Sequence, residues 1–253
     1  SPNTAITLFN NGEQTAETET NGEGHFSAEV ELHDGTNVLT AQASTDVGST
    51  EASAPVSIIL DQAKPELAIT SPSDGAKYNK ETVTVTGTVA DENLDFVKVN
   101  GQTATVNNGT YSKRILLDEG KNEITVQAKD KAGNSTKKSV SIDVKYTAPV
   151  IGNLTPSEDK ELESGDSVKV EFDSEAGLDA TFSILLPLTN VGAPTNAIEL
   201  PMRETSPGHY VGYYTATKNV KANGAAIQVT ATDDYGNKTI ERAEGLLYIN
   251  STK

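Results

Sequence analysis

Residues 117–128 read Leu-Asp-Glu-Gly-Lys-Asn-Glu-Ile-Thr-Val-Gln-Ala, and residues 32–43 read Leu-His-Asp-Gly-Thr-Asn-Val-Leu-Thr-Ala-Gln-Ala. The two stretches lie 85 positions apart and share Leu, Gly, Asn, Thr, Gln and Ala at equivalent places. The match continues upstream, where Gly24-His-Phe-Ser aligns with Gly109-Thr-Tyr-Ser, and downstream, where Gly48 aligns with Gly133. Self-similarity at a fixed offset indicates a chain built from copies of one structural unit.

The periodicity inside the repeat is that of β-strands. Ile124, Val126 and Ala128 alternate with polar residues, so that one face of the segment is apolar. Residues 82–86 are a run of Thr and Val, and such β-branched residues favour strands over helices. Asn-Gly pairs, typical of tight hairpin turns, stand between these runs at residues 11–12, 21–22, 100–101, 108–109 and 223–224. The pattern predicts an all-β chain of immunoglobulin-like β-sandwiches.

A third, more distant copy occupies the C-terminal part of the chain. Residues 208–210 resemble residues 24–26, and the Asp-Asp-Tyr-Gly-Asn turn at 233–237 resembles the Asp-Lys-Ala-Gly-Asn turn at 130–134. Two segments that end in proline separate the copies, and proline makes such connections short and stiff. We therefore expect three tandem domains in a semi-rigid row, the third longer and divergent. Their predicted boundaries are residues 1–61, 62–145 and 146–253.

The first copy lacks part of the unit. Ile6-Thr-Leu corresponds to Val97-Lys-Val in the second copy, where two further strands, at residues 65–69 and 82–86, come before it. Those opening strands have no counterpart in the first copy. We expect the first domain to be an incomplete sandwich, and a unit that is naturally short is the alternative.

Composition excludes several classes of function. The 253 residues contain 36 acidic and 20 basic side chains, for a net charge of −16, and residues 1–61 contain ten acidic and no Lys or Arg residues. Nucleic-acid affinity depends on clustered basic residues, so we expect no nucleic-acid partner. No apolar run approaches the roughly 20 residues that span a bilayer, so we expect no membrane insertion. Without cysteine, disulfides and thiol chemistry are excluded.

With these motifs laid out, the chain resembles tandem bacterial immunoglobulin-like domains of the glucodextranase B type. The residues that carry this resemblance are 69–75, 83–89, 97–101, 117–122 and 130–134. The arrangement is also similar to the C-terminal region of the bacillopeptidase F-like proteases, large secreted subtilisin-type serine proteases of Gram-positive bacilli. The resemblance implies a secreted or cell-surface location and the catalytic domain of a parent protein as covalent partner. The subtilisin Asp, His and Ser motifs are absent from this sequence, so no catalytic residue carries over.

The turns that close the second and third copies are the best candidates for a metal site. Asp130 and Asn134, and likewise Asp233, Asp234 and Asn237, offer the oxygen ligands that calcium prefers. The alternative is an Asx-turn, in which the carboxylate accepts hydrogen bonds from nearby backbone N–H groups. No other cofactor is expected.

Other polar and aromatic residues have ordinary explanations. His25 and His209 follow equivalent glycines, which favours solvent-facing strand positions, and His33 is the third histidine. Tyr213 and Tyr214 are the only adjacent aromatic pair, and strand alternation predicts one ring in the core and one outside. A single exposed tyrosine is a weak platform for a sugar.

A covalent crosslink is a further alternative. Lys169 lies on a predicted early strand and Asn250 on the predicted final strand, an arrangement similar to domains locked by a Lys–Asn isopeptide bond. Such a bond also requires a buried acid beside the two residues. The sequence alone does not place one there.

The sequence therefore predicts a structural function. We expect a monomeric, non-catalytic spacer that belongs to a large secreted serine protease. The alternative is an adhesin-like module that binds cell-wall glycan or a surface protein.

Overall fold

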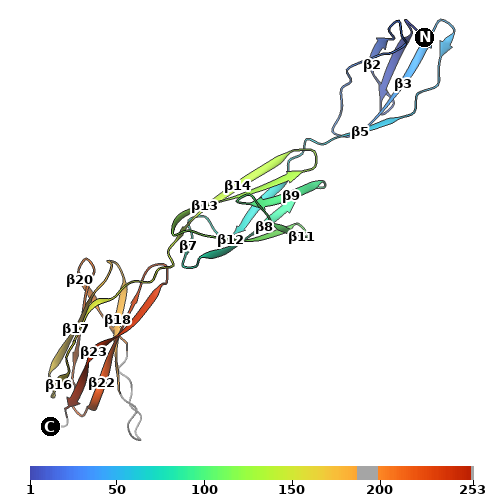
Figure 1. Cartoon of the computed structure of the whole chain (residues 1–253). Coiled ribbons are helices and arrows are strands. Elements are labelled where there is room, and N and C mark those ends of the chain that lie inside the picture. Colours follow the sequence, from blue (N-terminus) through green and yellow to red (C-terminus); the bar gives the residue numbers. More distant parts are fainter. Residues whose placement is uncertain (187–198, 252–253) are drawn as a thin grey trace. The chain divides into compact units, whose positions relative to one another are not determined.

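The computed structural model describes residues 1–186 and 199–251, and the regular structure in these residues consists of strands alone (Figure 1). The fold class is therefore all-β, as predicted. Nothing in the described residues forms a helix long and apolar enough to cross a membrane.

Residues 1–61 form one sheet of five strands. Its order is β2-β1-β3-β4, and β5 pairs with β3. The β1–β2 hairpin turns at Asn11 and Gly12, whose φ angles of 51° and 87° are those that Asn and Gly tolerate best. The strands are β1 (Ala5–Asn10), β2 (Glu13–Glu19), β3 (Gly35–Thr45), β4 (Gly48–Ser49) and β5 (Val56–Leu60).

The next residues form two sheets, with the orders β10-β9-β13-β14-β7 and β11-β12-β8-β6. Val99 and Ile124 from the first sheet and Val85 and Tyr111 from the second are completely buried. The strands are β6 (Glu66–Ser71), β7 (Lys77–Tyr78), β8 (Thr82–Ala90), β9 (Leu94–Val99), β10 (Gln102–Thr103), β11 (Thr105–Asn107), β12 (Thr110–Leu116), β13 (Gly120–Asp130) and β14 (Ser135–Val144).

The last part of the chain also forms two sheets, β15-β17-β21-β20 and β16-β23-β22-β18-β19. Their shared core contains Phe172 stacked on Tyr210 with ring centroids 5.0 Å apart, together with Phe182 and Ile227. The strands are β15 (Gly152–Thr155), β16 (Lys160–Leu162), β17 (Ser167–Asp173), β18 (Asp179–Leu185), β19 (Leu200–Pro201), β20 (Arg203–Ser206), β21 (His209–Thr215), β22 (Lys221–Thr232) and β23 (Lys238–Asn250).

Strand register supports the repeat that the sequence predicts. In the second copy Val97 and Val99 pair with Ala128 and Val126. In the first copy Ile6 pairs with Ala43 and Leu8 with Ala41. Ala43 and Ala128 are 85 positions apart, and so are Ala41 and Val126. Residues 6–8 and 97–99 therefore pair with equivalent residues of their repeats, which confirms their correspondence.

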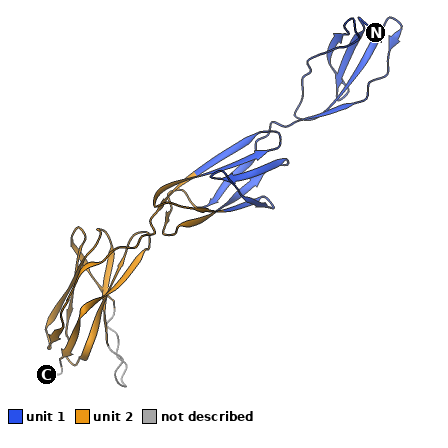
Figure 2. Cartoon of the chain, in the orientation of Figure 1, with its two compact units in different colours: residues 1–71, 85–113, 125–139 blue, residues 72–84, 114–124, 140–253 orange. Residues whose placement is uncertain are grey.

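Grouping by proximity divides the chain into two compact units (Figure 2). One contains residues 1–71, 85–113 and 125–139, and the other contains residues 72–84, 114–124 and 140–253. The division passes through β8, β12, β13 and β14 of the second repeat. Each sheet of the described residues takes its strands from one of the three predicted segments, and the three-domain boundaries stay a prediction.

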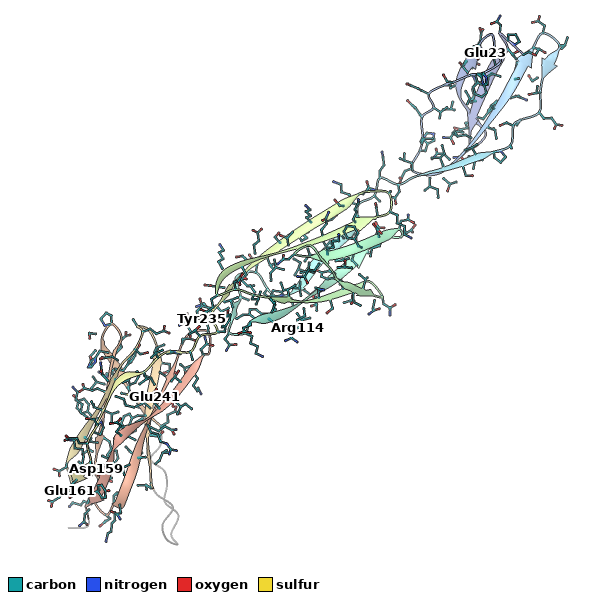
Figure 3. All side chains as sticks on the ribbon, viewed as in Figure 1. Glu23, Arg114, Asp159, Glu161, Tyr235 and Glu241 are labelled. Atoms are coloured by element: carbon teal, nitrogen blue, oxygen red, sulfur yellow. The ribbon has the colours of Figure 1, made fainter. Side chains whose placement is uncertain are left out.

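The surface carries much of the acidic charge. Glu23, Asp159, Glu161 and Glu241 are exposed side chains on strands and loops (Figure 3). Exposed acidic groups of this kind are solvated, and Asp159 Oδ1 also accepts a hydrogen bond from the N–H group of Leu246 at 2.8 Å.

Candidate functional site

The Asp-x-x-Gly-Asn turn of the second repeat is built around a buried carboxylate. Asp130 ends β13 and is 1% exposed. Its Oδ1 accepts hydrogen bonds from the backbone N–H groups of Gly133 (2.6 Å) and Asn134 (2.8 Å). Its Oδ2 accepts a third hydrogen bond from Asn134 Nδ2 at 2.8 Å. The turn is thus closed by its own side chains.

The third repeat contains the same arrangement. Asp233 follows β22 and is 8% exposed. Its Oδ1 accepts hydrogen bonds from the N–H groups of Tyr235 (3.0 Å) and Asn237 (2.8 Å). Its Oδ2 accepts one from Asn237 Nδ2 at 2.9 Å. Two turns 103 residues apart therefore have one design.

These hydrogen bonds control the charge state of both carboxyl groups. Burial alone would raise the pKa of Asp130, but hydrogen bonds from Asn134 and Gly133 outweigh it and lower the pKa. Burial also opposes ionisation of Asp233, and the hydrogen bonds from Asn237, with help from Lys145, again lower the pKa. Both groups are therefore held as carboxylates, which accept hydrogen bonds more strongly than neutral acids do.

Each turn also binds the segment that enters its own repeat. Asn134 Nδ2 donates a second hydrogen bond to the carbonyl oxygen of Asp61 at 2.9 Å. Thr136 Oγ1 donates to the carbonyl oxygen of Pro65 at 2.6 Å. Both carbonyls belong to residues 61–65, the first of the two predicted stiff connections. We call Asp130, Asn134 and Thr136 the first linker anchor.

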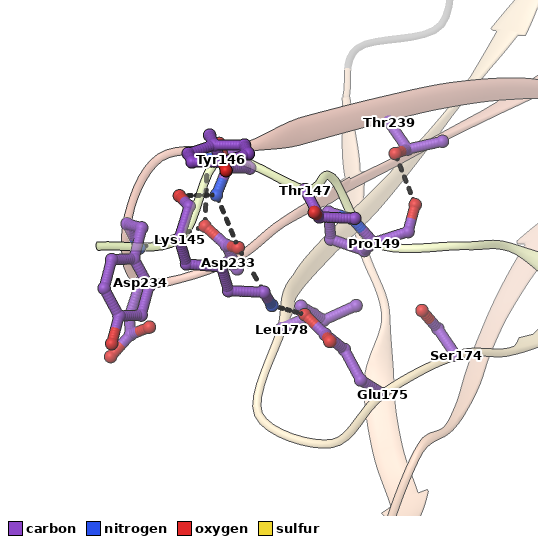
Figure 4. A network of polar contacts seen from close by, with 12 residues as sticks. Lys145, Tyr146, Thr147, Pro149, Ser174, Glu175, Leu178, Asp233, Asp234 and Thr239 are labelled. Atoms are coloured by element: carbon purple, nitrogen blue, oxygen red, sulfur yellow. Dashed lines mark hydrogen bonds and ion pairs between the residues drawn. The ribbon is translucent and has the colours of Figure 1, made fainter. Parts of the chain in front are cut away.

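The third repeat repeats these contacts (Figure 4). Asn237 Nδ2 donates to the carbonyl oxygen of Lys145 at 2.7 Å, and Thr239 Oγ1 donates to that of Pro149 at 2.5 Å. Residues 145–149 are the second predicted connection. We call Asp233, Asn237 and Thr239 the second linker anchor.

An ion-pair cluster adds to the second linker anchor. Lys145 Nζ lies 3.2 Å from Asp233 Oδ2 and 2.5 Å from Glu175 Oε1 (Figure 4). The hydrogen bond from Lys145 to Glu175 raises the pKa of Lys145, although burial opposes this shift.

Glu119 also binds the second connection. Its Oε1 accepts hydrogen bonds from the backbone N–H groups of Tyr146 (3.0 Å) and Thr147 (2.8 Å). The hydrogen bonds from Thr147 lower the pKa of Glu119.

The structure places the five calcium candidates in these turns. Asp130 and Asn134 lie in the first linker anchor, and Asp233 and Asn237 lie in the second. Asp234 points elsewhere and forms an ion pair with Lys77. Over residues 1–186 and 199–251 no three His, Asp or Glu side chains are grouped as metal ligands would be. The geometry is that of the Asx-turn alternative, and calcium binding stays a prediction.

The isopeptide alternative finds no support in the geometry. Lys169 lies on β17 with its side chain 46% exposed, and its amine forms an ion pair with Glu171. Asn250 lies at the end of β23, in the opposite sheet, where its register partner is Lys221. Solvent exposure of the lysine is contrary to the buried setting that such a bond requires.

The histidines occupy three different settings. His25 is exposed outside any strand, so its predicted strand position is wrong. The backbone N–H of His33 donates to Asn37 Oδ1 at 2.9 Å, and its carbonyl oxygen accepts from Asn37 Nδ2 at 2.7 Å. His209 begins β21, and its Nδ1 lies 2.7 Å from Asp173 Oδ1. Hydrogen bonds from Asn153 and then His209 lower the pKa of Asp173.

The tyrosine pair follows the predicted alternation. Tyr213 is 64% exposed, and Tyr214 packs against the core. Tyr213 borders a shallow groove of about 350 Å³ with Lys169, Arg203 and His209. The groove offers one aromatic ring, two basic side chains and a histidine.

Sequence reasoning missed the residues that bind the connections. Thr136 and Thr239 each stand two residues after the turn asparagine, so the signal was the longer pattern Asp-x-x-Gly-Asn-x-Thr, present in both repeats. Glu119 and Glu175 had no such signal, because their contacts depend on how distant segments fold together.

Comparisons with known proteins agree with this architecture. Residues 65–146 match the family described as glucodextranase, domain B. The chain is 53% identical over 252 residues to a segment of bacillopeptidase F from Bacillus subtilis (strain 168). The match covers 99% of this chain and 18% of that protein, so the chain is homologous to a fraction of its relative.

Two solved structures share the fold at low sequence identity. A three-domain immunoglobulin fragment of titin, in an E-to-A mutated variant, matches with a TM-score of 0.51 and 13% identity, covering 97% of this chain and 88% of that one. An I-band fragment of titin matches with a TM-score of 0.50, 12% identity and the same coverage. At these identities the likeness shows the immunoglobulin fold alone.

Proposed function

We propose that this chain is a non-catalytic accessory region of a large secreted serine protease and that it acts as a spacer between the protease's modules. The observation that carries the proposal is the pair of linker anchors. Each proline-bearing connection is hydrogen-bonded to the turn of the repeat that follows it. A spacer needs connections that keep one conformation, and side-chain hydrogen bonds to linker carbonyls restrict the backbone in this way.

The relation to a protease rests on homology to bacillopeptidase F over 99% of this chain. A secreted, extracellular location goes with that proposal. The partner is then the catalytic domain of the same polypeptide, and the chain itself is a monomer.

The spacer proposal is tested by small-angle scattering of the full chain and of an Asn134→Ala, Asn237→Ala double variant. The parent chain should fit a narrow range of radii of gyration, and the double variant should need a broader range because both linkers lose a hydrogen bond. Ser135→Ala with Lys238→Ala is the matched control, since these neighbouring side chains do not bind the linkers. Identical scattering from all three proteins would remove the linker anchors as the basis of a spacer.

A binding function is the second candidate, favoured by the exposed ring of Tyr213 beside the shallow groove. Aromatic rings stack on sugars because both present extended apolar surfaces. A binder should pellet with purified cell wall, and Tyr213→Ala should abolish pelleting. A spacer should stay in the supernatant. Hydrolysis of casein or glucan above a blank would contradict both candidates.

A further inference from the structure

The first sheet has an apolar face that is largely open. Of seven apolar residues on this side that we compare with the second repeat, Ile6 alone is buried, five are half-buried, and Ile58 is 38% exposed. We call these residues the first-sheet face. Its members are Ile6, Leu8, Leu39, Ala41, Ala43, Ile58 and Leu60.

The second repeat shows the same positions covered. Each repeat counterpart of the first-sheet face is at most 2% exposed. The sheet β11-β12-β8-β6 supplies the other half of that sandwich, with Val83, Val85 and Val89 buried on β8. The counterparts are Val97, Val99, Ile124, Val126, Ala128, Ile142 and Val144.

The segment of the first repeat that corresponds to β12 is present but forms no strand. Tyr111 lies on β12 in the second repeat and is completely buried. Its counterpart in the first repeat, Phe26, is 45% exposed, and residues 20–34 form no strand. In the second repeat β12 is paired on one side with β8 and on the other with β11. Without such a partner, the equivalent residues of the first repeat have no sheet to join.

The edge of the first sheet is open as well. In the second repeat β7 pairs in parallel with β14, through Lys77 with Asp143 and Tyr78 with Val144. The first-repeat equivalent of β14 is β5, whose pairing among the described strands is with β3. Residues 65–90 of the second repeat thus provide the cover, the partner of β12 and the edge strand together.

We propose that the first-sheet face is a docking surface for a strand segment with the chemistry of residues 65–90: two extended runs with apolar residues at alternate positions. Electrostatics disfavour a second copy of this chain as the occupant. Residues 1–61 contain ten acidic and no Lys or Arg residues, so two copies face to face would oppose like charges. Residues 65–90 contain two lysines and three acidic residues, so such a segment brings a net charge of −1, against −10 for a second copy of residues 1–61. This inference is independent of the proposed spacer function.

The test adds a copy of residues 65–91 directly before Ser1 of the full chain. The copied Asp91 then precedes Ile6 by six residues, the spacing it has from Val97 in the second repeat. Hydrogen exchange, read on the peptides that contain β1, β3 and β5, should slow by about tenfold or more as the face becomes covered. Binding of a dye specific for exposed apolar surface should fall in parallel.

The matched control carries the same extension with Leu67→Ser, Val85→Ser and Val89→Ser in the copy. It should leave exchange in the first sheet at the level of the unextended chain. Equal exchange in the extended protein, its control and the parent would overturn the proposal. So would a parent chain that is dimeric in sedimentation with β1, β3 and β5 already protected, since a second copy would then occupy the face.

Discussion

At the scale of single residues, the asparagine of each linker anchor donates two side-chain hydrogen bonds, one to the turn aspartate and one to a carbonyl oxygen of the connection. Asn237 is 7% exposed, and its Nδ2 bridges Asp233 and the carbonyl oxygen of Lys145. Asn237→Ala would leave both acceptors without this donor in a site that water hardly reaches. We expect the free energy of unfolding to fall by about 1–3 kcal/mol. Urea unfolding measures it, with the neighbouring Lys238→Ala as control, and equal midpoints for the two variants would contradict this.

The anchor carboxylates also predict how stability depends on pH. The folded-state pKa values of Asp130 and Asp233 are lowered below their ordinary value. Such groups stabilise the fold above the unfolded pKa of about 4, and this contribution is lost as pH falls through the folded pKa. The melting temperature should therefore fall as the pH is lowered from about 5 to about 2.5.

Replacing the two groups separates their share of the acid effect from that of other carboxylates. In Asp130→Asn with Asp233→Asn the melting temperature should depend less on pH over the same acid range, whatever its value at neutral pH. Glu23→Gln, a change at an exposed residue outside both anchors, should keep the parent's pH dependence. A double variant as acid-sensitive as the parent would show that other groups dominate.

At the scale of strands, one glycine fixes how closely β6 and β8 approach. Gly87 is buried in the middle of β8, and a Cβ there would lie 2.0 Å from the carbonyl oxygen of Ala68 and 2.3 Å from Tyr111 Oη. Tyr111 Oη donates to that same carbonyl at 2.9 Å, so the added carbon would displace a partly buried hydrogen bond. Gly87→Ala should destabilise the second repeat by at least about 2 kcal/mol.

Gly152 provides the matched control for that substitution. It begins β15, and a Cβ there would lie 3.8 Å from its nearest neighbour, the carbonyl oxygen of Asp173, which is ordinary contact. Gly152→Ala should change the free energy of unfolding by less than about 0.5 kcal/mol. Urea unfolding followed by hydrogen exchange in each repeat compares the two variants. Equal losses would mean that the close approach at Gly87 relaxes freely.

Strands were predictable because alternation and turn chemistry are local. The run Ile124, Val126 and Ala128 forms the buried side of β13 as the sequence indicates, and Asn100-Gly101 forms a tight turn with φ angles of 45° and 78°. The parallel pairings of β7 with β14 and of β16 with β23 were not predictable. Short edge strands follow from tertiary packing and carry almost no pattern of their own.

The candidate site was predictable in part for the same reason. The Asx-turn alternative at Asp130 and Asp233 came from local sequence and matches the hydrogen bonds of the structure. The second hydrogen bond of each turn asparagine reaches a carbonyl at least 73 residues away. No spacing within the turn encodes such a partner. The one signal in the sequence, which was missed, is the threonine that stands two residues after the turn asparagine in both repeats.

At the scale of the whole molecule, net charge complicates any test of calcium binding. With a formal charge of −16, any cation stabilises the compact state by screening the repulsion between acidic groups. Calcium must therefore be compared with magnesium at equal ionic strength. If free calcium is at ~100 times the dissociation constant of a specific site, binding should add about 2.7 kcal/mol to the free energy of unfolding. Such a gain raises the melting temperature by several degrees.

We expect calcium and magnesium to give the same melting temperature, and a chelator to change nothing. The reason is that both oxygens of Asp130 and of Asp233 already accept hydrogen bonds from their own turns, so a metal ion would have to displace them. A rise with calcium alone that saturates with concentration would contradict this expectation. Asn134→Ala and Asn237→Ala would then identify the turn, because a ligand residue should abolish the rise in its own repeat and leave the other unchanged.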